Sequence, residues 1–235
     1  MKLKRKISGI EELTEVQKKQ MFHLMELYYG NSKRTEFDRD LKEKNWVLLL
    51  TEEESGKIAG FSTQKLIPSH KNGNQALVLF SGDTIIAKEH WGSMALSLCF
   101  GELMLKLLNE YPESSLYWML ISKGLRTYKY LPTFFINYYP CYDKEIPDEI
   151  LKLMHYLGEL KYPGMYNSEK GIIEAKSDGQ FLKQEYEPQV NSKKPHEVFY
   201  YKANPGHYKG DELLCLAQLS MDNINPFIKR ILKKL

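Results

Sequence analysis

The amino-acid sequence predicts a mixed α/β fold of the α+β class, and three observations support this prediction. A polar turn joins two apolar runs at 46–51 and 57–67, a pattern typical of an antiparallel hairpin. Two further apolar runs at 76–80 and 116–121 flank a long helical pattern, which is the order of a βαβ unit with a right-handed crossover. Helical periodicity also precedes the hairpin and follows the last run, so helices and strands share one chain.

The first half of the chain predicts two helices and three strands. Residues 12–29 have apolar side chains at helical spacing and end at Gly30-Asn31, a pair that often ends helices. A short surface helix is expected at 35–44, followed by the hairpin strands at 46–51 and 57–67. A long strand then runs from 76 to 87 through Gly82-Asp83, and a glycine inside a strand is typical of a bulge.

The second half begins with a strongly apolar helix. Between 91 and 109 the larger polar residues Glu102, Lys106 and Asn109 fall on one stripe, which predicts a helix buried on most of its surface. The strand at 116–121 follows, then an aromatic-rich helical region at 122–139 that Pro132 shortens or kinks. Residues 147–158 predict another helix, and the runs 197–203 and 212–219 predict a closing hairpin.

Composition and charge are those of an ordinary globular protein of 235 residues, 43% hydrophobic and 27% charged. The 33 Lys and Arg exceed the 30 Asp and Glu, but eight of the cations lie in the first six and last seven residues. We interpret these ends as solvated tails around a mildly acidic body, which disfavours nucleic-acid binding. We expect one domain over 1–235, with an insertion at about 143–197 before the closing hairpin.

Cysteine and histidine spacing and the absence of targeting patterns suggest a cytoplasmic protein. Cys99, Cys141 and Cys215 are too far apart for a C-x-x-C pair and odd in number, so we expect neither a disulfide framework nor a zinc ribbon. The histidines show no metal-binding spacing, so no metal is expected. No signal-peptide pattern or transmembrane run is present, so we expect neither export nor a membrane span.

The order of these elements resembles the GNAT superfamily of N-acyltransferases over about 10–140 and 197–219. In that family a segment of the form V-x-P-x-x-R-G-x-G-x-G joins the fourth strand to the third helix and holds the pyrophosphate of coenzyme A. First-turn amides have no partner inside a helix and lie at the positive end of its dipole, which favours an anion there. The corresponding run departs from the pattern at Ala87, His90 and Trp91, and it reads Ile85-Ile86-Ala87-Lys88-Glu89-His90-Trp91-Gly92-Ser93-Met94-Ala95.

The resemblance implies a twisted, mostly antiparallel sheet of about six or seven strands with helices on both faces. It implies a splay between the fourth and fifth strands, beginning near Gly82, and makes Asp83 the candidate general base. The family pattern N-x-x-A-x-x-L-Y, laid on 123–130, makes Tyr130 the candidate acid. Acetyl-CoA or a longer acyl-CoA is the implied co-substrate, held by Ile85, Ile86, Lys88, His90, Trp91, Gly92, Ser93, Met94 and Ala95.

We therefore expect an N-acyltransferase that moves an acyl group from acyl-CoA, or from an acyl carrier protein, to a small-molecule or peptide amine in a ternary complex. Packing alone also explains Tyr130, and Asp83 also suits a bulge or solvent position. The aromatic segment at 134–139 suits either a tunnel for a long acyl chain or a packed core.

Two other functional classes stay open. One is a GNAT-like binding or regulatory module without catalysis, which the altered phosphate-binding run would explain. The other is an interaction protein whose basic, amphipathic C-terminus contacts a partner or an anionic membrane through Ile228, Ile231, Leu232 and Leu235.

Overall fold

The computed structural model describes residues 2–71 and 74–233. Its main sheet has the order β1-β3-β4-β5-β6-β11-β9-β8, with β7 also pairing with β11, and β2 and β10 form a second, small sheet. The main-sheet pairs are antiparallel except for β5 and β6, which are parallel. The strands are β1 (Leu3–Gly9), β2 (Tyr29–Gly30), β3 (Trp46–Glu52), β4 (Ile58–Lys71), β5 (Asn74–Ile86), β6 (Ser115–Ser122), β7 (Tyr138–Tyr139), β8 (Tyr166–Asn167), β9 (Ile172–Ile173), β10 (Phe181–Leu182) and β11 (Glu212–Gln218).

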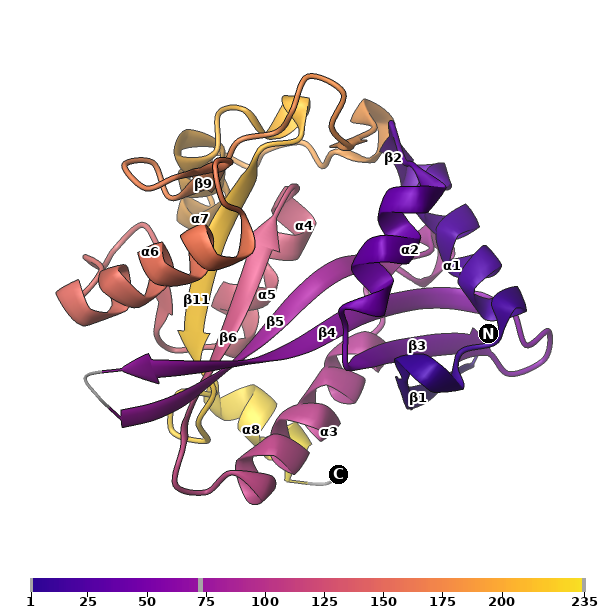
Figure 1. Cartoon of the computed structure of the whole chain (residues 1–235), viewed down its shortest axis with the longest axis horizontal. Helices are drawn as coiled ribbons and strands as arrows, with labels where there is room; N and C mark the ends of the chain where they lie inside the picture. The colour runs from indigo at the N-terminus through magenta and orange to yellow at the C-terminus, as the bar shows by residue number, and fades with distance from the viewer. Residues whose placement is uncertain (1, 72–73, 234–235) are drawn as a thin grey trace.

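Helices cover both faces of this sheet, which confirms the predicted fold class (Figure 1). Leu77 and Leu79 of β5 face the core beneath α3, whereas Val78 and Phe80 face α6, because successive strand residues point to opposite faces. The α-helices are α1 (Glu15–Tyr28), α2 (Arg34–Lys42), α3 (Ala95–Glu110), α4 (Leu125–Tyr128), α5 (Tyr130–Phe134), α6 (Asp148–Lys161), α7 (Pro195–Ala203) and α8 (Pro226–Leu232). Four short 3₁₀ turns lie at Ile10–Glu12, Lys88–His90, Gln184–Tyr186 and His207–Lys209.

The basic N-terminal segment is an edge strand, so its interpretation as a solvated tail was wrong. It pairs with β3 from Leu3 opposite Glu52 to Gly9 opposite Trp46. Leu3 and Ile7 pack against the core, while the lysines and arginine between them stay largely exposed. Basic side chains are common on edge strands because they discourage pairing with another chain.

The predicted closing hairpin was also wrong, because residues 197–203 lie in helix α7. Pro195 occupies its first turn, where proline is favoured, and the Tyr200 side chain is fully buried. β11 is paired on one side by β6 and on the other by β7 and β9, so it has no free edge for the 197–203 segment.

Apolar side chains near the C-terminus pack into the core of the molecule. Ile228 and Leu232 of α8 are buried against the same cluster as α3, and a Cβ at Gly101 would lie 2.3 Å from Leu232 Cδ2. Ile231 is half-buried, and Leu235 lies outside the described residues. Over the described ranges 2–71 and 74–233, no helix combines the length and apolarity needed to span a bilayer.

The sheet splits between β5 and β6, as the resemblance implied. The two strands pair from Ala76 opposite Ser115 to Ser81 opposite Leu120. Beyond this point β5 stays paired with β4, and β6 stays paired with β11. The split therefore opens one edge of each strand in the middle of the sheet.

A β-bulge lies at the start of this split, as predicted. Gly82 and Asp83 together oppose Thr63 of β4, because the pairing shifts between Ser62 and Gln64. A Cβ at Gly82 would lie 2.6 Å from Thr63 Oγ1 and 2.9 Å from Lys44 Cε, so only glycine fits without displacing a neighbour. The bulge turns the Asp83 side chain toward the face covered by α2, where it lines a pocket.

Candidate functional site

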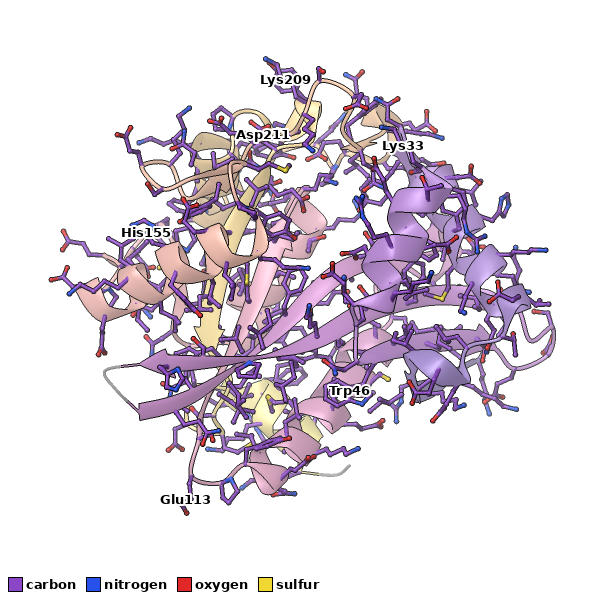
Figure 2. The ribbon with its side chains drawn as sticks, viewed as in Figure 1. Lys33, Trp46, Glu113, His155, Lys209 and Asp211 are labelled. Atoms are coloured by element: carbon purple, nitrogen blue, oxygen red, sulfur yellow. The ribbon has the colours of Figure 1, made fainter. Side chains whose placement is uncertain are left out.

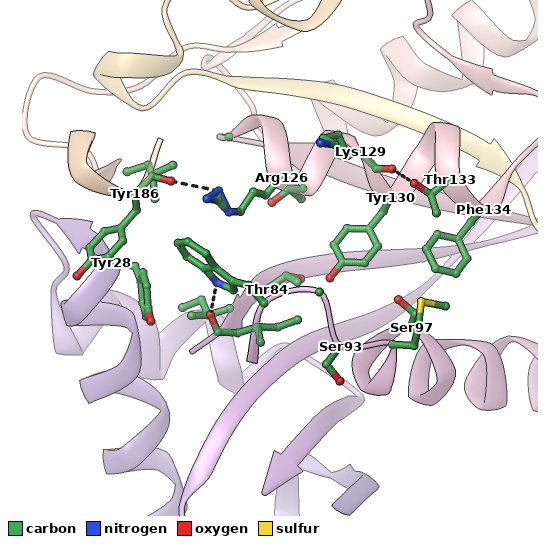
Figure 3. A pocket seen from close by; sticks show the side chains of 18 of the residues that line it. Tyr28, Thr84, Ser93, Ser97, Arg126, Lys129, Tyr130, Thr133, Phe134 and Tyr186 are labelled. Atoms are coloured by element: carbon green, nitrogen blue, oxygen red, sulfur yellow. Dashed lines mark hydrogen bonds between the residues drawn. The ribbon is translucent and has the colours of Figure 1, made fainter. Parts of the chain in front are cut away.

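A cleft of about 400 Å³, called here the main cleft, opens where β5 and β6 part (Figure 3). Its walls come from the end of β5, the start of α3 and the helices α4 and α5. Arg126 and Lys129 line it, Lys129 is paired with Glu197 at 3.2 Å, and none of the described lining residues is acidic. The cleft therefore favours an anionic ligand. Its other main lining residues are Tyr28, Tyr29, Thr84, Ile85, Ile86, Trp91, Gly92, Ser93, Met94, Ser97, Thr127, Tyr130, Phe134 and Tyr186.

The junction between β5 and α3 exposes main-chain atoms to this cleft. Gly92, Ser93 and Met94 are exposed and line it, and Gly92 has φ +88° with open space where a Cβ would project. Ser93 Oγ accepts a hydrogen bond from Ala95 N at 3.2 Å, but Met94, at the N-cap, makes no side-chain cap. The remaining first-turn amides of this 16-residue helix are thus available to an anion.

Trp91 stands beside this junction and does not cover it. Its indole Nε1 donates to the Ile86 carbonyl at 2.9 Å, on the edge of β5 that the split leaves open. The Arg126 guanidinium lies 3.7 Å from the centre of the indole ring, in a cation–π contact. Trp91 and Arg126 together form a stacked pair across the cleft, held from both sides of the split.

The structure does not bring every residue of the predicted run into the main cleft. His90 is buried and its Nε2 lies 3.2 Å from Glu52 Oε1, so its ring is turned away from the cleft. The Lys88 side chain is exposed outside the cleft, and its backbone N–H donates to Tyr28 Oη at 2.6 Å. Ile85 and Ile86 line the cleft, whereas Ala95 lies just behind it.

One group among the described residues has the spacing of metal ligands. Glu52, Glu89 and His90 each place one ligand atom within 4.8 Å of the others. Ser55 and His90 hydrogen-bond to Glu52, and these bonds hold the pKa of that carboxyl below its usual value. The direct pairing of Glu52 with His90 accounts for the closeness of the group, and it lies outside the main cleft.

Tyr130 and Tyr128, neighbours in sequence, have different environments. Tyr130 lines the main cleft, and Figure 3 shows it extending from α5 toward the side of the cleft that carries Ser93 and Ser97. Burial raises the pKa of Tyr130 to about 12, so its hydroxyl keeps the proton at neutral pH. Tyr128 is fully buried, and its hydroxyl donates to the Pro140 carbonyl at 3.1 Å. Tyr130 can meet a ligand, and Tyr128 cannot.

A second pocket of about 210 Å³, called here the acidic pocket, lies on the opposite face beneath α2. It contains four acids, Glu36, Asp40, Asp83 and Glu212, together with Lys33, Lys123 and the aromatic rings of Tyr29, Phe37, Phe80 and Tyr162. Lys33 lies at the N-terminal end of α2 (Figure 2).

Ion pairs already hold most of the charges in the acidic pocket. Lys33 pairs with Glu36 at 3.4 Å and with Asp178 at 2.5 Å, and Lys123 pairs with Glu212 at 3.4 Å. Lys44, whose side chain is buried, pairs with Asp40. Among the described residues, no hydrogen bond or salt bridge holds the Asp83 carboxylate, which leaves it open to a ligand in this pocket.

The environment of Asp83 changes its proton affinity. Burial, followed by the charge of Asp40, raises the pKa of Asp83 to about 7 against the opposite effect of Lys44 and Lys123. A carboxyl group with this pKa exchanges its proton near neutral pH, which suits a general base.

The main cleft and the acidic pocket meet through the split in the sheet. Tyr29, Thr84, Ile85 and Thr127 line both of them. A ligand bound on one face can therefore reach a ligand bound on the other at this point. Asp83 lines the acidic pocket, while Tyr130 and the Gly92 to Met94 segment line the main cleft, on the two sides of this shared wall.

Sequence reasoning missed two kinds of residue in the site. Arg126 and Lys129 follow Lys123 at intervals of three residues directly after a buried strand, a spacing that could have indicated a basic wall. Glu36, Asp40 and Glu212 come from distant segments, so no local pattern relates them to Asp83.

No protein-family model matches this chain, and no curated protein does. Its fold is similar to solved structures. A conserved protein of unknown function from Enterococcus faecalis V583, described as a probable N-acyltransferase, is 16% identical over 57% of this chain, with a TM-score of 0.43. The match covers 33% of that protein, so this chain spans about a third of its length.

Two smaller proteins are also similar. A Trypanosoma brucei acetyltransferase is 14% identical over 62% of this chain and 98% of its own, with a TM-score of 0.39. A GNAT family N-acetyltransferase from Escherichia coli, solved with CoA, is 15% identical over 52% of this chain and 65% of its own, with a TM-score of 0.37. The likeness of this chain to these three structures is one of fold.

Proposed function

We propose that this chain is an N-acyltransferase that moves an acyl group from acyl-CoA, or from an acyl carrier protein, to an amine. The observation that carries the proposal is the split in the sheet. A cleft lined by the Arg126 guanidinium on one face meets, at Thr84, a pocket on the other face where no described residue forms an ion pair with Asp83. An anionic thioester donor and a cationic amine acceptor have the charges that these two spaces attract.

The residues of the main cleft fit the donor. The first-turn amides of α3 and the guanidinium of Arg126 suit a pyrophosphate, and the absence of a side chain at Gly92 leaves room for its oxygens. The open edge of β5 beyond Ser81 has main-chain groups that can pair with the amides of a pantetheine arm. The Trp91 indole is already hydrogen-bonded to the Ile86 carbonyl, so a bound acyl-CoA either lies beside this hydrogen bond or breaks it.

The proposed reaction is direct attack of the amine on the thioester in a ternary complex. Asp83 accepts one proton from the acceptor ammonium, and the neutral amine then attacks the carbonyl carbon. The C–N bond forms and the C–S bond breaks, while Tyr130 donates a proton to the leaving thiolate. The second proton of the nitrogen passes to solvent, and Tyr130 takes a proton back from solvent. Holding both reactants at Thr84 supplies much of the rate enhancement.

A binding module without turnover is the second candidate. It is favoured by the hydrogen bond from the Trp91 indole to the Ile86 carbonyl. The indole occupies a carbonyl oxygen to which a bound acyl-CoA would otherwise hydrogen-bond. Such a module would bind CoA but release no free CoA from acetyl-CoA in the presence of amines. Measuring binding and turnover on one preparation separates the two candidates.

Calorimetric titration with CoA and acetyl-CoA tests donor binding. We expect saturable binding that Gly92→Glu abolishes, because the new carboxylate enters the phosphate position. Gly164→Glu is the matched control, since Gly164 is also exposed, has φ +71° and has open space around a Cβ. Failure of the unmodified protein to bind CoA, or equal loss in both variants, would contradict the proposed function.

A further inference from the structure

A small blind pocket continues the main cleft toward the core. Its volume is about 30 Å³, and it shares Thr84, Ser97, Tyr130 and Phe134 with the cleft. Its remaining walls are Leu48, Ser62, Ser81, Leu96, Phe100, Trp118 and Leu120. The pocket therefore begins beside the residues around which the proposed reaction takes place.

Several polar groups of its wall form one chain of hydrogen bonds, and the hydroxyls of Ser97 and Tyr130 stand outside this chain. Trp118 Nε1 donates to Ser81 Oγ at 2.8 Å, and Ser81 Oγ donates to Gln64 Oε1 at 2.8 Å. Gln64 Nε2 donates to Ser62 Oγ at 2.7 Å, and Ser62 Oγ lies 2.7 Å from Thr84 Oγ1. Because these hydroxyls are satisfied within the protein, an apolar group can fill the pocket without leaving them unpaired.

Two aromatic rings, Phe100 and Trp118, belong to the part of the pocket wall that the main cleft does not share. The Phe100 and Trp118 ring centres lie 4.7 Å apart, and Trp118 also packs against Phe135 at 5.5 Å. The bond from Trp118 Nε1 to Ser81 holds the indole in place, so this ring cannot swing aside cheaply.

We infer that this blind pocket receives the acyl chain of the donor and limits it to a short one, with Phe100 and Trp118 as the residues that set the length. The inference rests on the proposed function. A thioester carbon at Thr84 has two spaces for its tail, and the acidic pocket would surround an apolar tail with charges. The pocket is small, about 30 Å³, so it suits a short acyl group better than a long chain. The alternative use of this aromatic region as a tunnel for a long chain is not favoured.

Competition calorimetry with acetyl-, propionyl-, hexanoyl-, octanoyl- and palmitoyl-CoA on the full chain tests the inference without needing an acceptor. We expect acetyl- and propionyl-CoA to bind at least as tightly as CoA, and the longer thioesters to bind about tenfold more weakly or worse. Equal or tighter binding of octanoyl- or palmitoyl-CoA would overturn the inference while leaving the proposed function intact. Absence of any CoA binding would instead remove the proposed function and this inference with it.

A variant tests which residues set the length. Phe100→Ala removes one ring from the pocket wall, so we expect hexanoyl-CoA to approach the affinity of acetyl-CoA. Phe199→Ala is the matched control, because Phe199 is also a partly buried phenylalanine packed on the same core but lies outside the cleft. A Phe100→Ala protein that binds CoA but keeps the original chain-length profile would overturn the role of Phe100.

Discussion

The acidity of Asp83 gives the sharpest prediction about the site. Burial and the charge of Asp40 raise the pKa of this carboxyl from its ordinary value of 3.8 to about 7. With this pKa, about a tenth of the carboxyl is ionised at pH 6 and about nine tenths at pH 8. Since the ionised form is the base, kcat/KM should rise about tenfold over this range and then level off.

Two neighbours should move this titration in opposite directions. Asp40→Asn removes a negative charge beside Asp83, so the apparent pKa should fall. Lys44→Met removes a buried positive charge that favours the ionised form, so the apparent pKa should rise. The opposite signs distinguish electrostatic tuning of Asp83 from a general loss of structure, which would lower the rate at every pH.

The assay is ¹³C NMR of carboxyl-labelled aspartate, with Asp83→Asn used to assign the signal, beside the pH profile of thiol release from acetyl-CoA. The NMR titration needs no acceptor, so it tests the electrostatics even before the amine is identified. A resonance for Asp83 that titrates near pH 4, or a midpoint that Asp40→Asn leaves unmoved, would refute the reasoning.

Three further predictions follow from the same contacts. Tyr130→Phe should lower kcat about 100-fold or more and leave CoA affinity unchanged. Tyr128→Phe should lower the unfolding temperature instead, because the Tyr128 hydroxyl is hydrogen-bonded to the Pro140 carbonyl. The reverse pattern would remove the assignment of Tyr130 as the acid. Leu232→Ala should cost about 2–5 kcal/mol of unfolding free energy, while the exposed Phe227→Ala on the same helix should cost about 0.5 kcal/mol or less, and equal values would mean that α8 is not part of the core. The raised pKa keeps a proton on folded Asp83 that the unfolded chain releases, so the contribution of this group to stability falls as the pH rises from about 4 to about 7. Chemical denaturation should therefore show that Asp83→Asn gains stability relative to the unmodified chain between those pH values. Absence of this gain would contradict the raised pKa of Asp83.

The elements with clear periodicity could be predicted from sequence, and short or context-dependent ones could not. Leu13, Met21 and Leu24 mark one face of the first helical region, and the helix found there ends two residues before the predicted Gly30. Residues 197–203 are rich in Val, Phe and Tyr, a strand-like composition, yet burial of Tyr200 against Tyr128 and Pro195 in the first turn give a helix. The two-residue strand β9 that pairs with β11 has too few residues to show a pattern.

In the candidate site, too, local sequence patterns predicted some features, and contacts between distant segments determine the others. Gly82 next to Asp83 in a strand indicated a bulge with an acid beside it, and the bulge lies there. The orientation of the Trp91 indole and the turn of His90 toward Glu52 depend on side-chain contacts across the fold, which no linear spacing encodes. The acids that shift the pKa of Asp83 are likewise brought together only by folding.

Hydrogen exchange measured with and without CoA is the sharpest test of donor binding at the split in the sheet, because it reports on the main-chain groups there. We predict that saturating CoA slows amide exchange in the peptides covering 82–97 and 124–134, and leaves the peptides of α6 and β1 unchanged. Slowed exchange elsewhere, with 82–97 unaffected at saturating CoA, would contradict the account.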